Sequence, residues 1–196
     1  MDGATPEFRL ACVLTKLAMS ATRGWHASGL EGVPRSGPLI VAANHISMVD
    51  PPLLGMSLSP VRWARFVGKE ELFRFPPLGL LLRRLGCIKL DRRGDVRAVR
   101  SALEVLERGG CMAMFPEGTR SRTGQPGKPK PGVALLARQA RAPVVPARVS
   151  HTRTLLGPEP FTIRFGAPIP PPPIEADSRE ADRAYAELVM ARIAQL

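Results

Sequence analysis

The sequence predicts an α/β fold with a mostly parallel central sheet flanked by helices. Short, continuous apolar runs alternate along the chain with helical patterns, and each run has the length of a buried strand. This alternation is typical of parallel sheets, because the crossover between two parallel strands usually passes through a helix that covers one face. Polar or charged motifs directly follow three of the runs, where α/β folds place functional residues.

The length of 196 residues suits one domain, 1–196, which buries roughly 70% of the surface of its unfolded chain. An N-terminal amphipathic helix is expected first, from residue 8 to residue 23. Its apolar positions approximate helical spacing, with basic residues elsewhere on the wheel: Phe8, Leu10, Val13, Leu14, Leu17 and Ala21 against Arg9, Lys16 and Arg23. Two interpretations stay open, a membrane-associating helix within residues 1–30 or a helix packed on its own domain.

The first expected strand is 39–43, because Leu39 to Ala43 is an uninterrupted apolar run. Asp50 and the prolines after it predict a helix that begins near Pro51, with Asp50 at its N-cap. Further elements are expected in this order: a strand at 63–67, a Pro-containing helix at 76–84 and a strand at 87–90.

The second half begins with the clearest helix, residues 95–108, which Gly109 and Gly110 end. The next elements are expected in this order: a strand at 111–115, a mobile loop at 124–132, a helix at 133–140, a strand at 143–149 and an edge strand at 161–165. Prolines 170–173 form a stiff spacer before a closing amphipathic helix. In that helix Arg192 falls near the apolar stripe and has to extend outward to reach water.

The chain is strongly basic, with a formal charge of +11 and a pI near 10.9, which attracts it to phosphates of nucleic acid or of an anionic membrane. Its few aromatic residues, seven Phe, two Trp and one Tyr, are not interleaved with basic runs as in proteins that stack bases. We therefore expect an anionic membrane surface as partner and no nucleic acid. No apolar stretch reaches the ~20 residues of a membrane span and no signal-peptide pattern is present, so the expected location is peripheral, on the cytoplasmic face of the cell membrane.

Cys12, Cys87 and Cys111 are odd in number, widely spaced and set in apolar sequence. This pattern predicts buried, reduced thiols in place of disulfides or a zinc site, and no metal is expected. The sequence also lacks the glycine-rich loops of nucleotide-binding proteins, so neither nucleotide hydrolysis nor hydride transfer is indicated.

The first motif with chemical meaning is Asn44-His45, with Asp50 five residues after the histidine. Imidazole accepts a proton near neutral pH, and a nearby carboxylate fixes its tautomer and stabilises the imidazolium. On an ideal helix the two side chains would be about 140° apart, so the chain must bend between them. His45 is the candidate general base and Asp50 its partner, and a capping role for Asp50 is compatible with this.

The second motif is FPEGTRSR, residues 115–122. Gly118 permits a tight turn, Arg120 offers fork-shaped donors for phosphate oxygens, and Glu117 can orient an arginine. The motif predicts a site for a phosphorylated substrate.

Four blocks occur in the order found in the glycerolipid acyltransferase family, which the chain resembles over most of its length. They are 44–50 (NHISMVD), 69–92 (from KE through Gly79 to KLDR), 115–120 (FPEGTR) and 143–146 (PVVP). The resemblance implies a glycerolipid acyltransferase-like fold and an enzyme that uses acyl-CoA or acyl-carrier protein as co-substrate, with no other cofactor. The implied acceptor is a lysophospholipid, 1-acylglycerol-3-phosphate, which is converted to phosphatidate in phospholipid biosynthesis.

The resemblance also assigns roles to residues. Glu117, Gly118, Thr119 and Arg120 would bind the acceptor, and Arg92 would contact its phosphate. The chain departs from the family at Pro77-Leu78, where an aromatic pair is common. Two alternatives remain, an acyltransferase for another lysolipid or a glycolipid, and a non-catalytic basic protein that binds membranes or nucleic acid.

Overall fold

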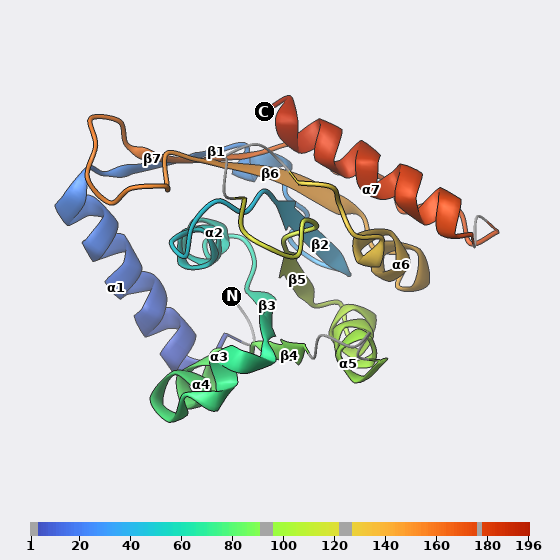
Figure 1. Ribbon diagram of the computed structural model, residues 1–196, viewed down its shortest axis with the longest axis horizontal. Coiled ribbons are helices and arrows are strands. Elements are labelled where there is room, and N and C mark those ends of the chain that lie inside the picture. Colours follow the sequence, from blue (N-terminus) through green and yellow to red (C-terminus); the bar gives the residue numbers. More distant parts are fainter. Residues whose placement is uncertain (1–3, 91–95, 122–126, 176–177) are drawn as a thin grey trace.

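The computed structural model describes residues 4–90, 96–121, 127–175 and 178–196. Its strands are β1 (Trp25–Ser28), β2 (Leu39–Ala43), β3 (Ala64–Lys69), β4 (Ile88–Leu90), β5 (Cys111–Met114), β6 (Val144–Ser150) and β7 (Phe161–Phe165). Its helices are α1 (Pro6–Thr22), α2 (Asp50–Leu58), α3 (Glu70–Arg74), α4 (Pro76–Arg84), α5 (Val96–Glu107), α6 (Gly132–Gln139) and α7 (Arg179–Ala194), with a short 3-10 helix η1 (Leu30–Gly32). The strands form one sheet in the order β1-β7-β6-β2-β5-β3-β4 (Figure 1). Five neighbouring pairs are parallel and β6–β7 is antiparallel, which confirms the mostly parallel sheet.

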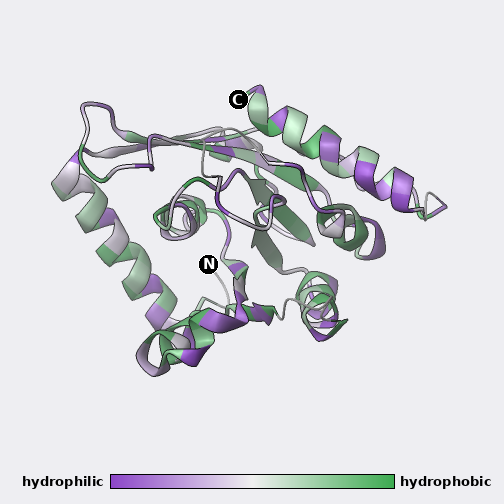
Figure 2. Cartoon of the chain, in the orientation of Figure 1, coloured by the Kyte–Doolittle hydropathy of each residue, from purple (hydrophilic) through white to green (hydrophobic). Residues whose placement is uncertain are grey.

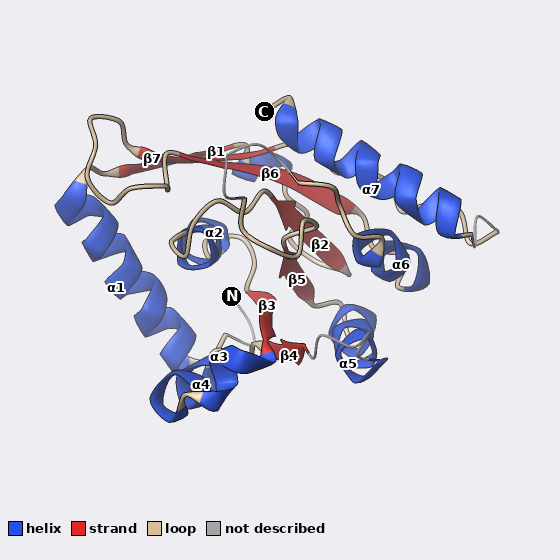
Figure 3. Cartoon of the chain, in the orientation of Figure 1, coloured by secondary structure: helices blue, strands red, loops and turns tan. Residues whose placement is uncertain are grey.

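Strand β2 lies at the centre of the sheet, and all five of its side chains are buried. Leu39 and Val41 belong to a cluster with residues of α1 and α2, whereas Ile40 and Ala42 belong to a cluster with residues of α5, α6 and α7. Because successive side chains of a strand point to opposite faces, the two clusters cover the two faces of the sheet. Figure 3 shows the helices on both sides, as predicted.

Most predicted elements agree with the structure within a few residues, and β2 and α4 have the predicted bounds. The strand predicted at 161–165 is confirmed with the same bounds as β7, whereas its predicted place at the edge of the sheet is wrong, since β7 pairs with β6 on one side and with β1 on the other. Strand β1 went unpredicted because its residues, WHAS, are too few and too polar to form an apolar run. The five-residue helix α3 was also missed. The predicted loop 124–132 lies partly outside the described residues, and its last residue begins α6.

The N-terminal helix α1 packs on α2 through an inner face that includes the buried Phe8 and Met19. Its N-cap is Thr5, whose hydroxyl oxygen accepts the Phe8 N–H at 3.2 Å. The outer face is apolar as well, with four side chains between 55% and 62% exposed: Leu10, Val13, Leu14 and Leu17. Figure 2 shows hydrophobic positions along this helix and along α4. Among the residues that the structure describes, no helix has both the length and the hydropathy needed to span a membrane.

The closing helix α7 packs on α6 and β6. The Tyr185 hydroxyl donates to the Pro170 carbonyl at 2.9 Å, which ties the proline segment to the helix. Arg192 is exposed, as predicted.

The three cysteines are free. Cys111 is buried as predicted, whereas Cys12 and Cys87 are half-buried. Burial raises the pKa of the Cys87 thiol to about 11 and that of Cys111 to about 12. These thiols therefore remain protonated at neutral pH, in agreement with structural roles.

Candidate active site

The two sequence motifs meet where β2 and β5 end. The strands are parallel neighbours, with Ala42 paired to Met114, so the turns that follow them leave the same edge of the sheet. The His45 backbone N–H donates to Glu117 Oε1 at 2.9 Å, and the Ser121 N–H donates to the His45 carbonyl at 2.8 Å. Residues 72 or more positions apart thus form one hydrogen-bonded unit.

His45 has the contacts expected of a positioned base. Its Nδ1 lies 2.9 Å from Asp50 Oδ2, and its ring stacks on Phe115 with centroids 4.2 Å apart and planes inclined by 18°. Because an ionised carboxylate can only accept, this contact assigns the proton to Nδ1 and leaves Nε2 free to accept one. The histidine side chain is 16% exposed and that of Asp50 fully buried, so a substrate can reach the ring and not the carboxylate.

Asp50 organises the turn that contains the histidine. Its Oδ2 also accepts the N–H groups of Ile46 at 2.6 Å and Ser47 at 2.7 Å. The predicted N-cap role for Asp50 is wrong, because Val49 occupies the cap and Asp50 is the first residue of α2. The physical reason is that the carboxylate points back to the preceding turn, where it binds two N–H groups and the imidazole.

Asn44 joins the active-site turn to β6, a role that sequence reasoning missed. Its Nδ2 donates to the Val149 carbonyl at 2.9 Å, and its Oδ1 accepts the Val149 N–H at 2.8 Å. The side chain is buried and satisfies both the N–H and the carbonyl group of one β6 residue. The available signal was an amide side chain at the end of a fully apolar strand, where a polar group needs a partner.

Glu117 is buried, and both of its carboxylate oxygens accept backbone N–H groups. Besides the His45 contact, Oε2 accepts the Gly127 N–H at 2.9 Å. The glutamate was expected to orient an arginine, whereas these two contacts connect the turn after β5 with the backbone at His45 and at Gly127. Its position therefore determines where the His45 turn lies relative to the residues that follow β5.

The remaining predicted acceptor residues occupy the turn after Glu117. Gly118 has φ 68°, a left-handed conformation that favours glycine, and the Lys130 side chain lies directly over it. Thr119 and Arg120 are exposed, so their side chains are accessible to a ligand. Arg92 lies outside the described residues.

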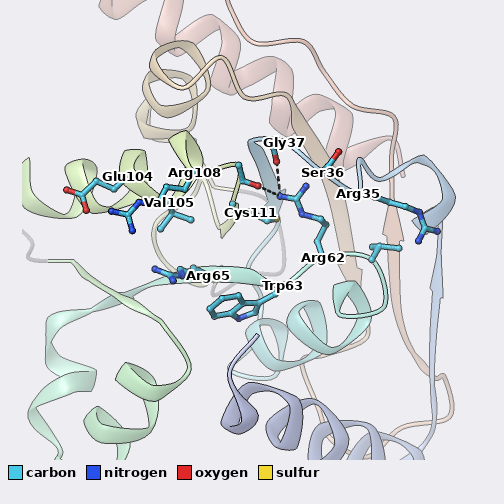
Figure 4. Close-up of a pocket in the computed structure, with 13 residues that line it drawn as sticks. Arg35, Ser36, Gly37, Arg62, Trp63, Arg65, Glu104, Val105, Arg108 and Cys111 are labelled. Atoms are coloured by element: carbon cyan, nitrogen blue, oxygen red, sulfur yellow. Dashed lines mark hydrogen bonds between the residues drawn. The ribbon is translucent and has the colours of Figure 1, made fainter. Parts of the chain in front are cut away.

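A cavity of about 510 Å³ lies at the opposite edge of the sheet, where β3 and β5 begin (Figure 4). Four arginines line it, and Arg62 donates 2.8 Å hydrogen bonds to the carbonyls of Gly37 and Gly109. Arg62 thereby satisfies carbonyl groups of two loops. This cavity is separate from the histidine site, because the motifs leave the sheet at the other ends of the strands.

Comparison with known proteins agrees with this geometry. A family model described as Acyltransferase matches residues 25–150, which contain both motifs. The chain belongs to the Acyltransferase family. It is 31% identical over 132 residues to the chloroplastic 1-acyl-sn-glycerol-3-phosphate acyltransferase BAT2 of Brassica napus, covering 65% of this chain and 38% of that protein. A 1-acyl-sn-glycerol-3-phosphate acyltransferase of Bacillus subtilis (strain 168) is 27% identical over 133 residues, covering 67% of this chain and 65% of the relative.

The fold also agrees with that of an acyltransferase crystal structure. The 1-acyl-sn-glycerophosphate (LPA) acyltransferase PlsC from Thermotoga maritima matches with a TM-score of 0.75 and 27% identity, over 96% of this chain and 78% of that one. The expected glycerolipid acyltransferase-like fold is therefore confirmed. The chain spans less than two thirds of the length of the two relatives named above.

Proposed function

We propose that the chain is an O-acyltransferase that moves a fatty acyl group from acyl-CoA or acyl-carrier protein to the free hydroxyl of 1-acylglycerol-3-phosphate, giving phosphatidate in phospholipid biosynthesis. The observation that carries the proposal is the contact between His45 and Asp50. Glu117 binds the backbone of His45 at the sheet edge where residues 115–122 begin. The named activity of the relatives supports the choice of acceptor.

In the proposed reaction, Nε2 of His45 takes the proton of the acceptor hydroxyl as its oxygen attacks the thioester carbonyl. The tetrahedral intermediate collapses with cleavage of the C–S bond, and the departing thiolate receives the proton from His45. Asp50 holds the reactive tautomer and stabilises the imidazolium. A positioned base of this kind contributes ~10²–10⁴ in rate. The acyl group is transferred directly, without an acyl-enzyme intermediate. Ser47 stabilises the turn, since its hydroxyl oxygen accepts the Val49 N–H at 3.3 Å.

The phosphate of the acceptor is assigned to the turn after β5. The exposed guanidinium of Arg120 supplies donors in a fork that matches phosphate oxygens, and Thr119 supplies a hydroxyl. Gly118 allows the left-handed turn that places them side by side, and Arg92 is a further proposed contact. Holding the phosphate here orients the hydroxyl towards His45, which lowers the entropic part of the barrier.

A thioester donor and a panel of lysolipids and glycolipids test the proposal with the wild type. His45→Ala is expected to lower kcat by about 10²–10⁴-fold, whereas His26→Ala, at an exposed residue of β1, serves as the matched control. Full activity of His45→Ala would exclude the proposed base. Salt-sensitive binding to anionic vesicles without turnover of any thioester would favour the non-catalytic alternative.

Arg120→Ala tests the phosphate assignment. It is expected to raise the KM for phosphorylated acceptors selectively, because the charge-assisted contact is lost. Arg183→Ala, an exposed arginine on α7, controls for the change in net charge. An unchanged KM would remove Arg120 from the acceptor site.

Peripheral binding to the cytoplasmic face of the cell membrane is proposed through α1. The support is its exposed apolar outer face together with the net charge of +11, which an anionic surface attracts. Leu14→Glu is expected to weaken co-sedimentation with anionic vesicles, whereas Leu188→Glu on α7, where the leucine is 42% exposed, is the matched control. Equal binding by both variants would exclude α1 as the contact.

A further inference from the structure

Thr152 donates a hydrogen bond to Oδ1 of Asp50, the carboxylate oxygen that His45 does not contact. We propose that Thr152 is a positioning residue which, through Asp50, keeps His45 in the orientation and tautomer of a proton acceptor. Its effect on rate rests on the proposed function, in which His45 is the general base. Its effect on the imidazole is a separate, structural claim.

The contacts of Asp50 divide between its two oxygens. Oδ2 receives His45 Nδ1 and two backbone N–H groups, whereas Oδ1 accepts the hydroxyl of Thr152. Thr152 is 1% exposed and Asp50 fully buried, so water does not substitute for this hydroxyl. A buried carboxylate oxygen without a donor is strongly unfavourable, and a side chain that loses one of its donors is free to rotate towards another. The hydroxyl therefore keeps the plane of the carboxylate aligned with the imidazole.

Thr152 is positioned by the same pair of hydrogen bonds that joins the His45 turn to β6, those between Asn44 and Val149. Asn44 binds both backbone groups of Val149, so the end of β6 is joined to the residue before the catalytic histidine. Beyond β6 the backbone turns sharply at His151, whose φ is 65°. Asn44 and Val149 are 105 residues apart along the chain, and Asp50 and Thr152 are 102 residues apart. Movement of β6 relative to β2 would therefore disturb both contacts.

A purely structural role for Thr152 predicts a different outcome. If the residue only fills space, its shape matters and its hydroxyl does not. Thr152→Val keeps the shape and removes the donor, whereas Thr152→Ser keeps the donor and removes a methyl group. The two substitutions therefore separate packing from positioning.

The kinetic test measures kcat and both KM values for these variants. We expect Thr152→Val to lower kcat by about 10- to 100-fold with little change in either KM, since loss of a hydrogen bond to a buried charge misplaces the base and leaves the substrate contacts. Thr152→Ser should retain near wild-type kcat, and Thr162→Val on β7 is the matched control. In the Asp50→Asn background, Thr152→Val should have little further effect. The proposal is overturned if kcat is unchanged, if only KM rises, or if the loss is as large without Asp50.

A spectroscopic test does not depend on turnover. In ¹⁵N-histidine NMR spectra, with His45 assigned from the His45→Ala variant, the wild type is expected to show neutral His45 protonated at Nδ1. Thr152→Val should shift the His45 ring towards a mixture of tautomers, with Thr152→Ala as the replacement if valine is not accommodated. An unchanged His45 spectrum refutes positioning by Thr152. Absence of acyl transfer by the wild type would instead refute the proposed function, and the spectra would still decide the role of Thr152.

Discussion

Glu117→Gln should destabilise the fold and displace His45, although the substitution changes the size of the side chain little. The wild-type carboxylate accepts two backbone N–H groups, from His45 and Gly127, each at 2.9 Å, and the side chain is only 6% exposed. An amide has one accepting oxygen, so its NH₂ group must face one of these N–H donors. Hydrogen bonds to charged groups contribute ~1.5–3 kcal/mol, and an unsatisfied buried donor costs ~1–3 kcal/mol. With one bond weakened and one lost, the expected decrease in the free energy of unfolding is about 2–4 kcal/mol.

Urea and thermal denaturation followed by circular dichroism measure this effect. At about 2–4 °C per kcal/mol for a domain of this size, the Tm should fall by roughly 5–15 °C. Glu187→Gln, on the exposed face of α7, changes the net charge equally and should leave the Tm nearly unaltered. Below the new Tm the variant should also have a reduced kcat, since the hydrogen bond to the backbone N–H of His45 is either weakened or lost. A Glu117→Gln protein with wild-type stability and only a raised KM for the acceptor would refute the reasoning and favour direct contact with substrate.

Three further predictions concern the site and the fold that supports it. Asn44→Ala removes both buried hydrogen bonds to Val149 and should lower the free energy of unfolding, measured by urea titration, by about 2–4 kcal/mol. A change below ~0.5 kcal/mol would contradict the stabilising role of these two hydrogen bonds. Burial raises the pKa of the Cys111 thiol from 9.0 to about 12. As the pH rises, the thiol therefore ionises in the unfolded chain before it ionises in the folded protein. The contribution of the buried thiol to the free energy of unfolding is full below pH 9 and is lost as the pH rises towards 12. Cys111→Ala should reduce that alkaline loss, and an unaltered pH profile of stability would count against it. A Cβ at Gly29 would lie 2.0 Å from a β7 carbonyl oxygen, whereas one at Gly24 meets nothing within 4 Å, and both residues have positive φ. Gly24→Ala should therefore cost only the backbone strain of ~1–2 kcal/mol, and Gly29→Ala should cost clearly more. Equal Tm values for the two variants would refute the close approach of Gly29 to the Phe165 carbonyl.

Much of the fold followed from local patterns. The run from Leu39 to Ala43 could be recognised as a buried strand because both of its faces are covered, so every side chain is apolar. The ends of α4 were equally clear, since proline begins the helix and its last turn is basic. Strand β1 was not predictable in this way, because its four residues alternate between apolar and polar and become a strand only through pairing with β7, more than a hundred residues later.

The candidate site divides in the same manner. The sequence by itself determined the chemistry, an imidazole with a carboxylate five residues away and a glycine turn beside an arginine, because these relations lie within short segments. Only the tertiary structure decided that Glu117 holds the backbone of His45, that Asn44 joins β2 to β6 and that Thr152 binds Asp50. These contacts span 72 to 105 residues, and they form only because the order of strands in the sheet places β5 and β6 on either side of β2. Local propensity contains no information about that order, which is set by how the apolar faces of the whole chain are buried together.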